Sequence, residues 1–277
     1  MYYTQDLGYM DENDNLIVCG RKDDMIKING NRIEPAEIEN AIGQKLDYDR
    51  NVYKQARMAE STARGRAEML VMGEDAEETV EAINKTMKGK KLKHAVTLRS
   101  VFDLIKDADM SKKHPDYLAN GGFENWQHAF STYLTARRQL ELQKKNPDYV
   151  GPMDNKDAKA IVNNAPSELA EAAKKYYQYN DNMLTIAEDA GLISESVHNA
   201  LNTKYSDYAP MMRDFSDTAG VDSFFGGLGG RGIGNVSNFL KKISKDGSSR
   251  NVIDPLETTV KNTYMILNRA ERNKVAQ

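Results

Sequence analysis

Apolar residues at helical spacing run through most of the chain after residue 50 and decide its fold class. Two such stripes are Val80, Ile83 and Met87, and Leu256, Val260, Tyr264 and Leu267. Residues three or four apart lie on one face of a helix, so each stripe predicts a helix with one buried face. Charged residues make up 29% of the chain and hydrophobic residues 40%, a balance that favours solvent-rich helices over one deep core. We therefore predict a mainly α protein with an elongated helical region.

Capping signals predict where several of these helices begin and end. Candidate N-caps precede four stripes: Thr97, Ser167, Ser194 and Asp254. Their short polar side chains can accept a hydrogen bond from a free N–H in the first helical turn. A long helix is expected from about Glu124 to Lys145, and Gly191 should end the helix that follows Ser167.

The first 33 residues have a different pattern, with short β-rich runs between polar turns. The runs are Tyr2–Thr4, Leu16–Cys19 and Met25–Ile28. Pro35 suits the first turn of a helix, where its missing N–H has no partner to lose. We predict a small α+β lobe at residues 1–45, followed by a helical region at 50–277.

Two motifs in the first lobe carry a resemblance to a known family. Tyr3-Thr4-Gln5-Asp6-Leu7-Gly8 and the run from Gly20 to Glu39, with Gly20-Arg21-Lys22-Asp23 at its start, stand in the order expected of that family. They resemble the hinge and C-terminal cap of adenylate-forming enzymes, such as nonribosomal peptide synthetase adenylation domains and acyl-CoA ligases. The resemblance covers residues 1–43, about a sixth of the chain.

The resemblance assigns roles to five residues on the ATP and pantetheine side. It implies that Asp6 accepts hydrogen bonds from the ribose hydroxyls of ATP and that Arg21 contacts the nucleotide. Asp23 matches the hinge, and Lys27 matches a lysine used in the second half-reaction of some members. Gly30 matches a glycine past which a phosphopantetheine arm moves. In the parent family, ATP, magnesium and phosphopantetheine are the implied cofactors.

Several departures predict that this chain is not active alone and binds none of these cofactors by itself. Gln5 stands where the family has glycine, and the large N-terminal lobe with its phosphate-gripping loop is missing. The family's second lysine falls near Lys112, whose surroundings do not resemble the usual loop. The lobe is therefore interpreted as a truncated segment, and no catalytic residue is assigned.

The region after residue 50 resembles a second group of proteins. Its segments are Tyr133–Arg138, Tyr208–Arg213, Gly247–Glu257 and Asn262–Asn273. They are similar to helical domains associated with large polyvalent proteins of phages and mobile elements. That likeness implies an interaction or scaffold module. Since the two families are not normally joined, the chain is interpreted as chimeric, with a junction near residues 43–53.

Other sequence features exclude some sites and leave others open. The four histidines, His94, His114, His128 and His198, lack metal-ligand spacing, so no metal site is predicted. The glycine-rich run 226–234 is interpreted as a hinge, because no strand precedes it and no Gly-Lys-Ser/Thr follows. Residues 231–277 hold nine basic and four acidic side chains, which is compatible with nucleic-acid binding but also with a solvated helical surface.

The sequence thus predicts a non-catalytic interaction module of a mobile-element polyvalent protein, fused to a truncated adenylation segment. The alternative is a fragment of an ATP-dependent enzyme that activates an amino or carboxylic acid. A protein partner is expected, and nucleic acid through residues 231–277 stays open. With no apolar stretch near the roughly 20 residues that span a bilayer, no membrane contact is expected, and the location should be cytoplasmic or phage-associated.

Overall fold

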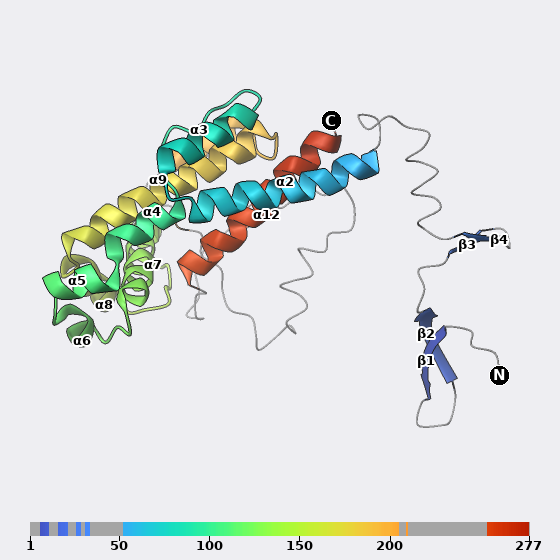
Figure 1. Cartoon of the computed structure of the whole chain (residues 1–277). Helices are drawn as coiled ribbons and strands as arrows, with labels where there is room; N and C mark the ends of the chain where they lie inside the picture. Colours follow the sequence, from blue (N-terminus) through green and yellow to red (C-terminus); the bar gives the residue numbers. More distant parts are fainter. Residues whose placement is uncertain are drawn as a thin grey trace. The chain divides into compact units, whose positions relative to one another are not determined.

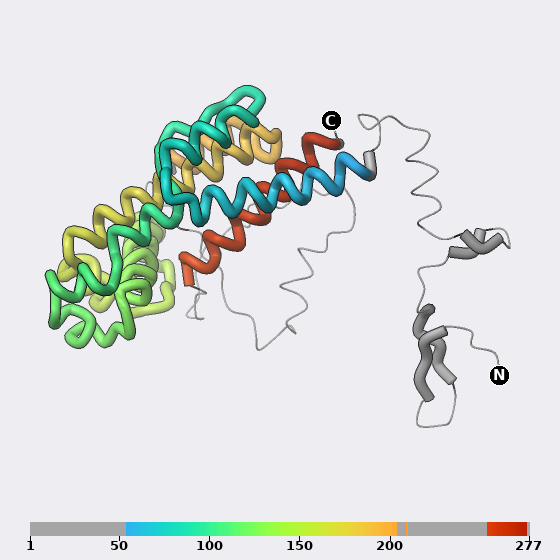
Figure 2. The backbone as a smooth tube through the Cα atoms, in the orientation of Figure 1, coloured from blue at the N-terminus to red at the C-terminus, as the bar shows by residue number. Residues whose placement is uncertain are grey.

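The computed structural model describes four strands within residues 6–33, together with residues 52–204, residue 209 and residues 254–276. The chain divides into two compact units, Met1–Arg57 and Met58–Gln277. Figure 1 labels their elements, and Figure 2 follows the backbone from one end to the other. Helices make up most of the described part, which confirms the prediction of a mainly α protein.

The first unit holds two small antiparallel sheets. Strand β1 (Asp6–Met10) pairs with β2 (Leu16–Arg21), and β3 (Ile26–Ile28) pairs with β4 (Asn31–Ile33). The predicted strands at 16–19 and 25–28 fall within or beside β2 and β3. Strand β1 was not predicted, because its Asp-Leu-Gly sequence has low β propensity and its pairing comes from the hairpin with β2. The runs at 2–4 and the helix expected from Pro35 lie outside the described residues.

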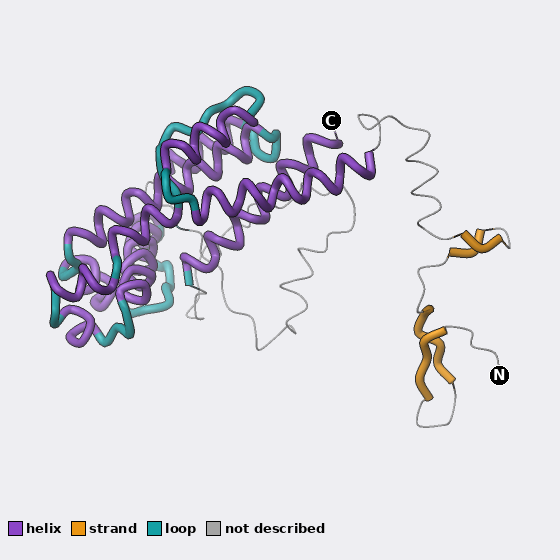
Figure 3. The backbone as a smooth tube through the Cα atoms, viewed as in Figure 1, coloured by secondary structure: helices purple, strands orange, loops and turns teal. Residues whose placement is uncertain are grey.

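The described part of the second unit is built from helices (Figure 3). In chain order they are α2 (Val52–Met72, which begins in the first unit), α3 (Ala76–Thr86), α4 (Leu98–Phe102), the 3-10 turn η2 (Asp103–Ile105), α5 (Asp107–Lys113), α6 (Tyr117–Gly121), α7 (Trp126–Lys145), α8 (Asn155–Asn163), α9 (Ser167–Asp189), α10 (Glu195–Lys204) and α12 (Pro255–Ala276). None of the helices in the described ranges is long and apolar enough to cross a bilayer.

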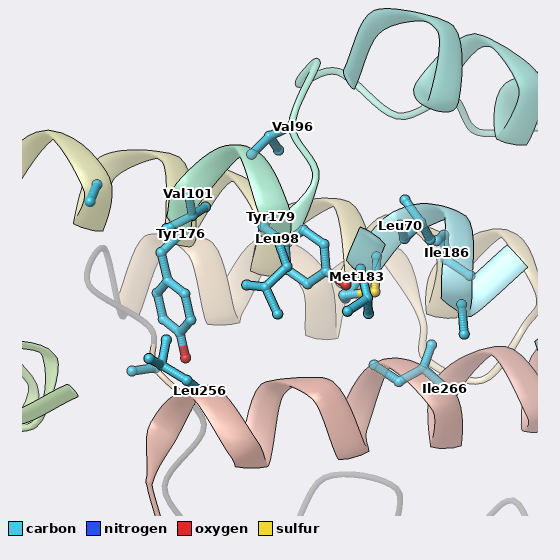
Figure 4. Close-up of a cluster of buried hydrophobic side chains, with 14 of the residues drawn as sticks. Leu70, Val96, Leu98, Val101, Tyr176, Tyr179, Met183, Ile186, Leu256 and Ile266 are labelled. Atoms are coloured by element: carbon cyan, nitrogen blue, oxygen red, sulfur yellow. The ribbon is translucent and has the colours of Figure 1, made fainter. Parts of the chain in front are cut away.

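Helix α9 is the centre of this unit, since α4, η2, α7, α10 and α12 all contact it. Figure 4 shows Tyr176, Tyr179 and Met183 of α9 among side chains of α4 and α12, such as Leu98 and Leu256. Burying apolar surface of this kind contributes about 25 cal/mol per Å² and is the main force that holds the helices together. Helices α3, α7, α9 and α12 supply more than half of this core, and members of the two predicted stripes, such as Ile83 and Leu267, are among these residues.

A row of buried hydroxyl groups joins α9 to α12. The Tyr176 hydroxyl lies 2.6 Å from Thr259 Oγ1, and the Tyr179 hydroxyl lies 2.8 Å from Thr263 Oγ1. Both tyrosines are fully buried, and burial raises the pKa of Tyr179 well above its ordinary value. Because a buried hydroxyl without a partner is costly, these pairs fix how far α12 can slide along α9.

Three of the four predicted N-caps are confirmed and one is wrong. Thr97 forms a reciprocal capping box with Ser100, Ser194 Oγ accepts from the Val197 N–H at 3.3 Å, and Asp254 Oδ1 accepts from the Leu256 N–H at 2.7 Å. Ser167 is the first residue of α9 and Pro166 occupies the cap position. Proline there brings the chain into the helix with a fixed φ, so the serine hydroxyl contacts Glu168 Oε2 instead.

Gly191 ends α9, as predicted, in a left-handed conformation. Its φ is 70°, its N–H donates to the Glu188 carbonyl, and the Leu192 N–H donates to the Ala187 carbonyl. These two bonds satisfy helix carbonyls that would otherwise lack partners, and they form a Schellman motif.

We expect Gly191→Ala to lower the free energy of unfolding by about 1 kcal/mol, because a side chain is disfavoured at positive φ. Gly89→Ala is the matched control, since Gly89 lies outside that conformation and an added Cβ would meet only ordinary contact with Asp189. Urea unfolding followed by circular dichroism measures both. Equal effects of the two substitutions would contradict the role given to the Gly191 backbone.

Candidate functional site

The residues that the sequence assigns to a nucleotide lie on the small sheets of the first unit, as far as they are described. Asp6 of β1 and Arg21 of β2 are directly opposite each other in the strand register. Lys27 of β3 is opposite Arg32 of β4. Asp23 and Gly30 lie outside the described residues. Two strand partners do not make a nucleotide site, so the five roles stay predictions and no reaction step follows from them.

The second unit contains a cluster of charged and polar side chains that was not predicted from the sequence. We call it the histidine–carboxylate network: Lys90, His94, Asp181, Glu188, His198 and Asn202. Helix α9 supplies Asp181 and Glu188, which are seven residues apart and therefore two turns along one face. Helix α10 supplies His198 and Asn202, and the connection between α3 and α4 supplies Lys90 and His94.

His198 bridges the two carboxylates of α9. Its Nδ1 lies 2.7 Å from Glu188 Oε2 and its Nε2 lies 3.1 Å from Asp181 Oδ1, while its side chain is only 8% exposed. An ionised carboxylate can only accept hydrogen bonds. A ring nitrogen that carries a proton can donate to such a neighbour, so His198 joins the two carboxylates of α9 through its two nitrogens.

The other members complete the hydrogen bonds of the same two carboxylates. Asp181 also accepts from Asn202 Nδ2 at 2.6 Å, and its second oxygen lies 3.2 Å from His94 Nε2. Burial would raise the pKa of Asp181, but the hydrogen bonds from Asn202 and His198 outweigh it and lower that pKa. The hydrogen bond from His198, together with one from Lys90, likewise lowers the pKa of Glu188.

The connection that carries Lys90 and His94 is also tied to α9 through its backbone. Asp189 accepts hydrogen bonds from three successive N–H groups, those of Lys88, Gly89 and Lys90, at 3.1, 2.7 and 2.8 Å. Burial works against ionisation, yet these three bonds together lower the pKa of Asp189. Successive N–H groups that converge in this way form a nest for an anion, and here a carboxylate of the same chain occupies it.

A second carboxylate with a histidine neighbour lies near the start of α9. Glu168 Oε2 is 3.2 Å from His114 Nε2, and Glu168 Oε1 is 3.3 Å from Lys113 Nζ. Its own backbone N–H in the first helical turn, followed by Lys113, His114 and Ser167, lowers the pKa of Glu168 to about 2. The neighbouring side chains and the N-terminus of α9 thus both stabilise the negative charge of the Glu168 carboxylate.

The network joins the α3–α4 connection to α9 and α10, with His94 and Asp181 87 residues apart in the chain, and its groups contact one another. Within residues 54–203, 209 and 254–275, no set of three or more metal-binding side chains is grouped as a metal site would require. The geometry supports a structural role, since these side chains join α10 and the α3–α4 connection to α9 through hydrogen bonds and ion pairs.

The basic segment proposed for nucleic acid is described only at residues 254–276. That stretch has four basic and three acidic residues, Lys261, Arg269, Arg272 and Lys274 against Asp254, Glu257 and Glu271. Lys261 pairs with Glu257, and Lys274 pairs with Glu271 at 2.8 Å. These pairs reduce the charge that this helix can offer to phosphates, and the rest of the segment lies outside the described residues.

The sequence held only a faint signal of the network. The seven-residue spacing of Asp181 and Glu188, and the four-residue spacing of His198 and Asn202, each predict a shared helix face. Nothing local indicates that His94 meets Asp181, 87 residues later in the chain. Comparison with other proteins adds no assignment: no family model, curated protein or solved structure matches this chain.

Proposed function

We propose that the chain is a non-catalytic interaction or scaffold module of a large polyvalent protein of phages or mobile elements, joined to a truncated adenylation segment. Its task is to present a stable helical surface to a protein partner. In this proposal, residues 1–43 do not by themselves carry out the ATP-dependent chemistry of their parent family, which also needs that family's large N-terminal lobe.

The observation that carries the proposal is the contact between α7 and α12, both of which also contact α9. The described parts of the polyvalent resemblance, Tyr133–Arg138 and Asn262–Asn273, lie on α7 and α12, and these two helices contact each other. Several of their buried polar groups pair within the unit, as Arg138 does with Glu141 and Thr263 with Tyr179. Residues engaged in internal pairing build a rigid support, which is what a docking module requires.

Crosslinking mass spectrometry of the full chain, in cells that carry its gene, tests this role. We expect crosslinks to one recurrent protein on exposed lysines of the helical unit, such as Lys93, Lys159 and Lys174. The alternative, a working part of an adenylate-forming enzyme, rests on the motifs that place Asp6 opposite Arg21. It predicts acid-dependent ATP–pyrophosphate exchange that Asp6→Ala abolishes and Asp11→Ala, outside the motif, leaves intact. Such exchange would overturn the proposal.

A further inference from the structure

The outward side of α2 carries exposed apolar side chains that the packing of the second unit does not use. Met58, Met69 and Met72 are 51%, 40% and 61% exposed. They are three of the five large apolar side chains that stand out on the surface of the described residues, the others being Val150 and Val197. The buried side of α2 is formed by Ala59, Ala63, Arg66, Ala67, Leu70 and Val71.

Gly65 lies at the middle of this outward side. At about 100° per residue it points away from Ala63 and Ala67, and Met58 and Met72 lie one heptad before and after it. Glycine inside a helix costs about 1 kcal/mol relative to alanine. A Cβ added at Gly65 would meet open space, so nothing in the described part of the chain requires a glycine here.

The spacing is symmetric about Gly65 in a way that fits a two-fold axis. Consider a two-fold axis that is perpendicular to the helix and lies between the Gly65 residues of two facing copies. It places Met58 of one copy opposite Met72 of the other, each about 10 Å along the helix from the axis. At the axis, two glycines allow the helix backbones to approach closely.

The charges beside this stripe obey the same symmetry. Arg64 and Glu68 lie on one flank of the stripe, where they pair with each other at 3.0 Å within the chain. The two-fold rotation brings Arg64 of one copy to within about 3 Å, measured along the helix axis, of the level of Glu68 in the other. Along this flank, Arg64 of each copy can then pair with Glu68 of the other, so the surface is complementary to itself in charge and in apolar contact.

We propose that two copies of this chain associate through this methionine face, defined as Met58, Gly65, Met69 and Met72, with their α2 helices antiparallel. The proposal rests on the role as an interaction module and names a second copy as a partner. The contact is formed by about four helical turns on each side, so it belongs to the small interfaces and the dissociation constant should be about micromolar.

Analytical ultracentrifugation of the full chain between about 1 and 200 µM tests the contact. Met58→Lys and Met72→Glu should each raise the dissociation constant about 10-fold, and the double variant should return to within about 3-fold of the parent, because each lysine then meets a glutamate of the other copy. Val150→Lys is the matched control, since Val150 is equally exposed elsewhere, and should leave association unchanged. Circular dichroism checks that every variant stays folded.

Gly65→Arg provides an independent measurement. It places bulk and like charge at the axis, where both copies meet, and should raise the dissociation constant at least about 100-fold. A double variant weaker than both single variants would indicate parallel pairing and overturn the proposal, as would a chain that is monomeric throughout or a dimer indifferent to Gly65→Arg. Crosslinks to a different protein on a monomeric chain would remove the self-association while leaving the interaction role intact.

Discussion

Glu271→Ala should lower the free energy of unfolding by about 3–5 kcal/mol, because it strips a buried arginine of its counter-charge. Glu271 of α12 forms an ion pair with Arg66 of α2, and the two side chains are only 10% and 6% exposed. In the described residues Arg66 Nε has no hydrogen-bond partner, so the guanidinium already depends on this one carboxylate. Urea unfolding followed at 222 nm measures the loss.

The magnitude reflects the cost of an unpaired charge more than the strength of the pair itself. Taking two charges out of water is expensive, and their mutual attraction roughly offsets that cost. Replacing both partners by apolar residues should therefore be far milder than removing one. We expect the double variant Arg66→Met, Glu271→Leu to unfold within about 1 kcal/mol of the parent chain.

Two comparisons make this test specific. Glu81→Ala removes an exposed partner of Lys85 and should leave the midpoint of unfolding almost unchanged, because such surface pairs contribute little. The double-mutant cycle then isolates the coupling between Arg66 and Glu271. Additive effects of Arg66→Met and Glu271→Leu would show that the pair does not hold α2 against α12 in the way proposed.

The helical framework could be predicted from the sequence wherever a stripe was long. Helices α7, α9 and α12 each bury several residues at helical spacing, and their ends carry recognisable signals such as Asn146, Gly191 and Asp254. The short helices α5 and α8 escaped prediction because they show almost no stripe. Among the described residues, α5 buries only Met110 and α8 only Ala158, which is too little for a pattern to emerge.

The polar contacts of the second unit could not be predicted, because they join residues far apart in the chain. Arg66 and Glu271 are separated by 205 positions, and His94 and Asp181 by 87. Each residue alone looks like one more charge on a solvated helix, as most such residues are. Only the packing of the helices against one another shows which charges are buried and paired. The five nucleotide residues of the first unit stay predictions.

His198→Ala should have the second large effect, a loss of about 2–4 kcal/mol near pH 6, because it leaves two shielded carboxylates without their shared donor. Asp181 and Glu188 are 20% and 9% exposed, so water is a poor replacement for the His198 ring as their hydrogen-bond partner. His198→Gln keeps one donor and should fall between the parent chain and the alanine variant. Urea unfolding at fixed ionic strength gives the three values.

The same substitution should change how stability depends on pH. The folded state lowers the pKa of Asp181 and Glu188, so their contribution is complete above the unfolded values near 4 and is lost as the pH falls through the folded values. His198 is the largest cause of the shift at Glu188. Without His198, protonation of these carboxylates removes less stability. The difference in the free energy of unfolding between His198→Ala and the parent chain should therefore narrow from pH 6 to pH 3.

Leu192→Ala separates this electrostatic loss from a simple packing defect. Leu192 is a buried, uncharged residue of the connection between α9 and α10. Its truncation should therefore lower the free energy of unfolding by about 2–5 kcal/mol at pH 6 and by a similar amount at pH 3. A His198→Ala penalty that stays constant over the same range would mean that the ring acts by filling space. A penalty that shrinks in acid, beside a constant one for Leu192→Ala, identifies the hydrogen bonds of the His198 ring to Asp181 and Glu188 as the contacts that hold α10 on α9.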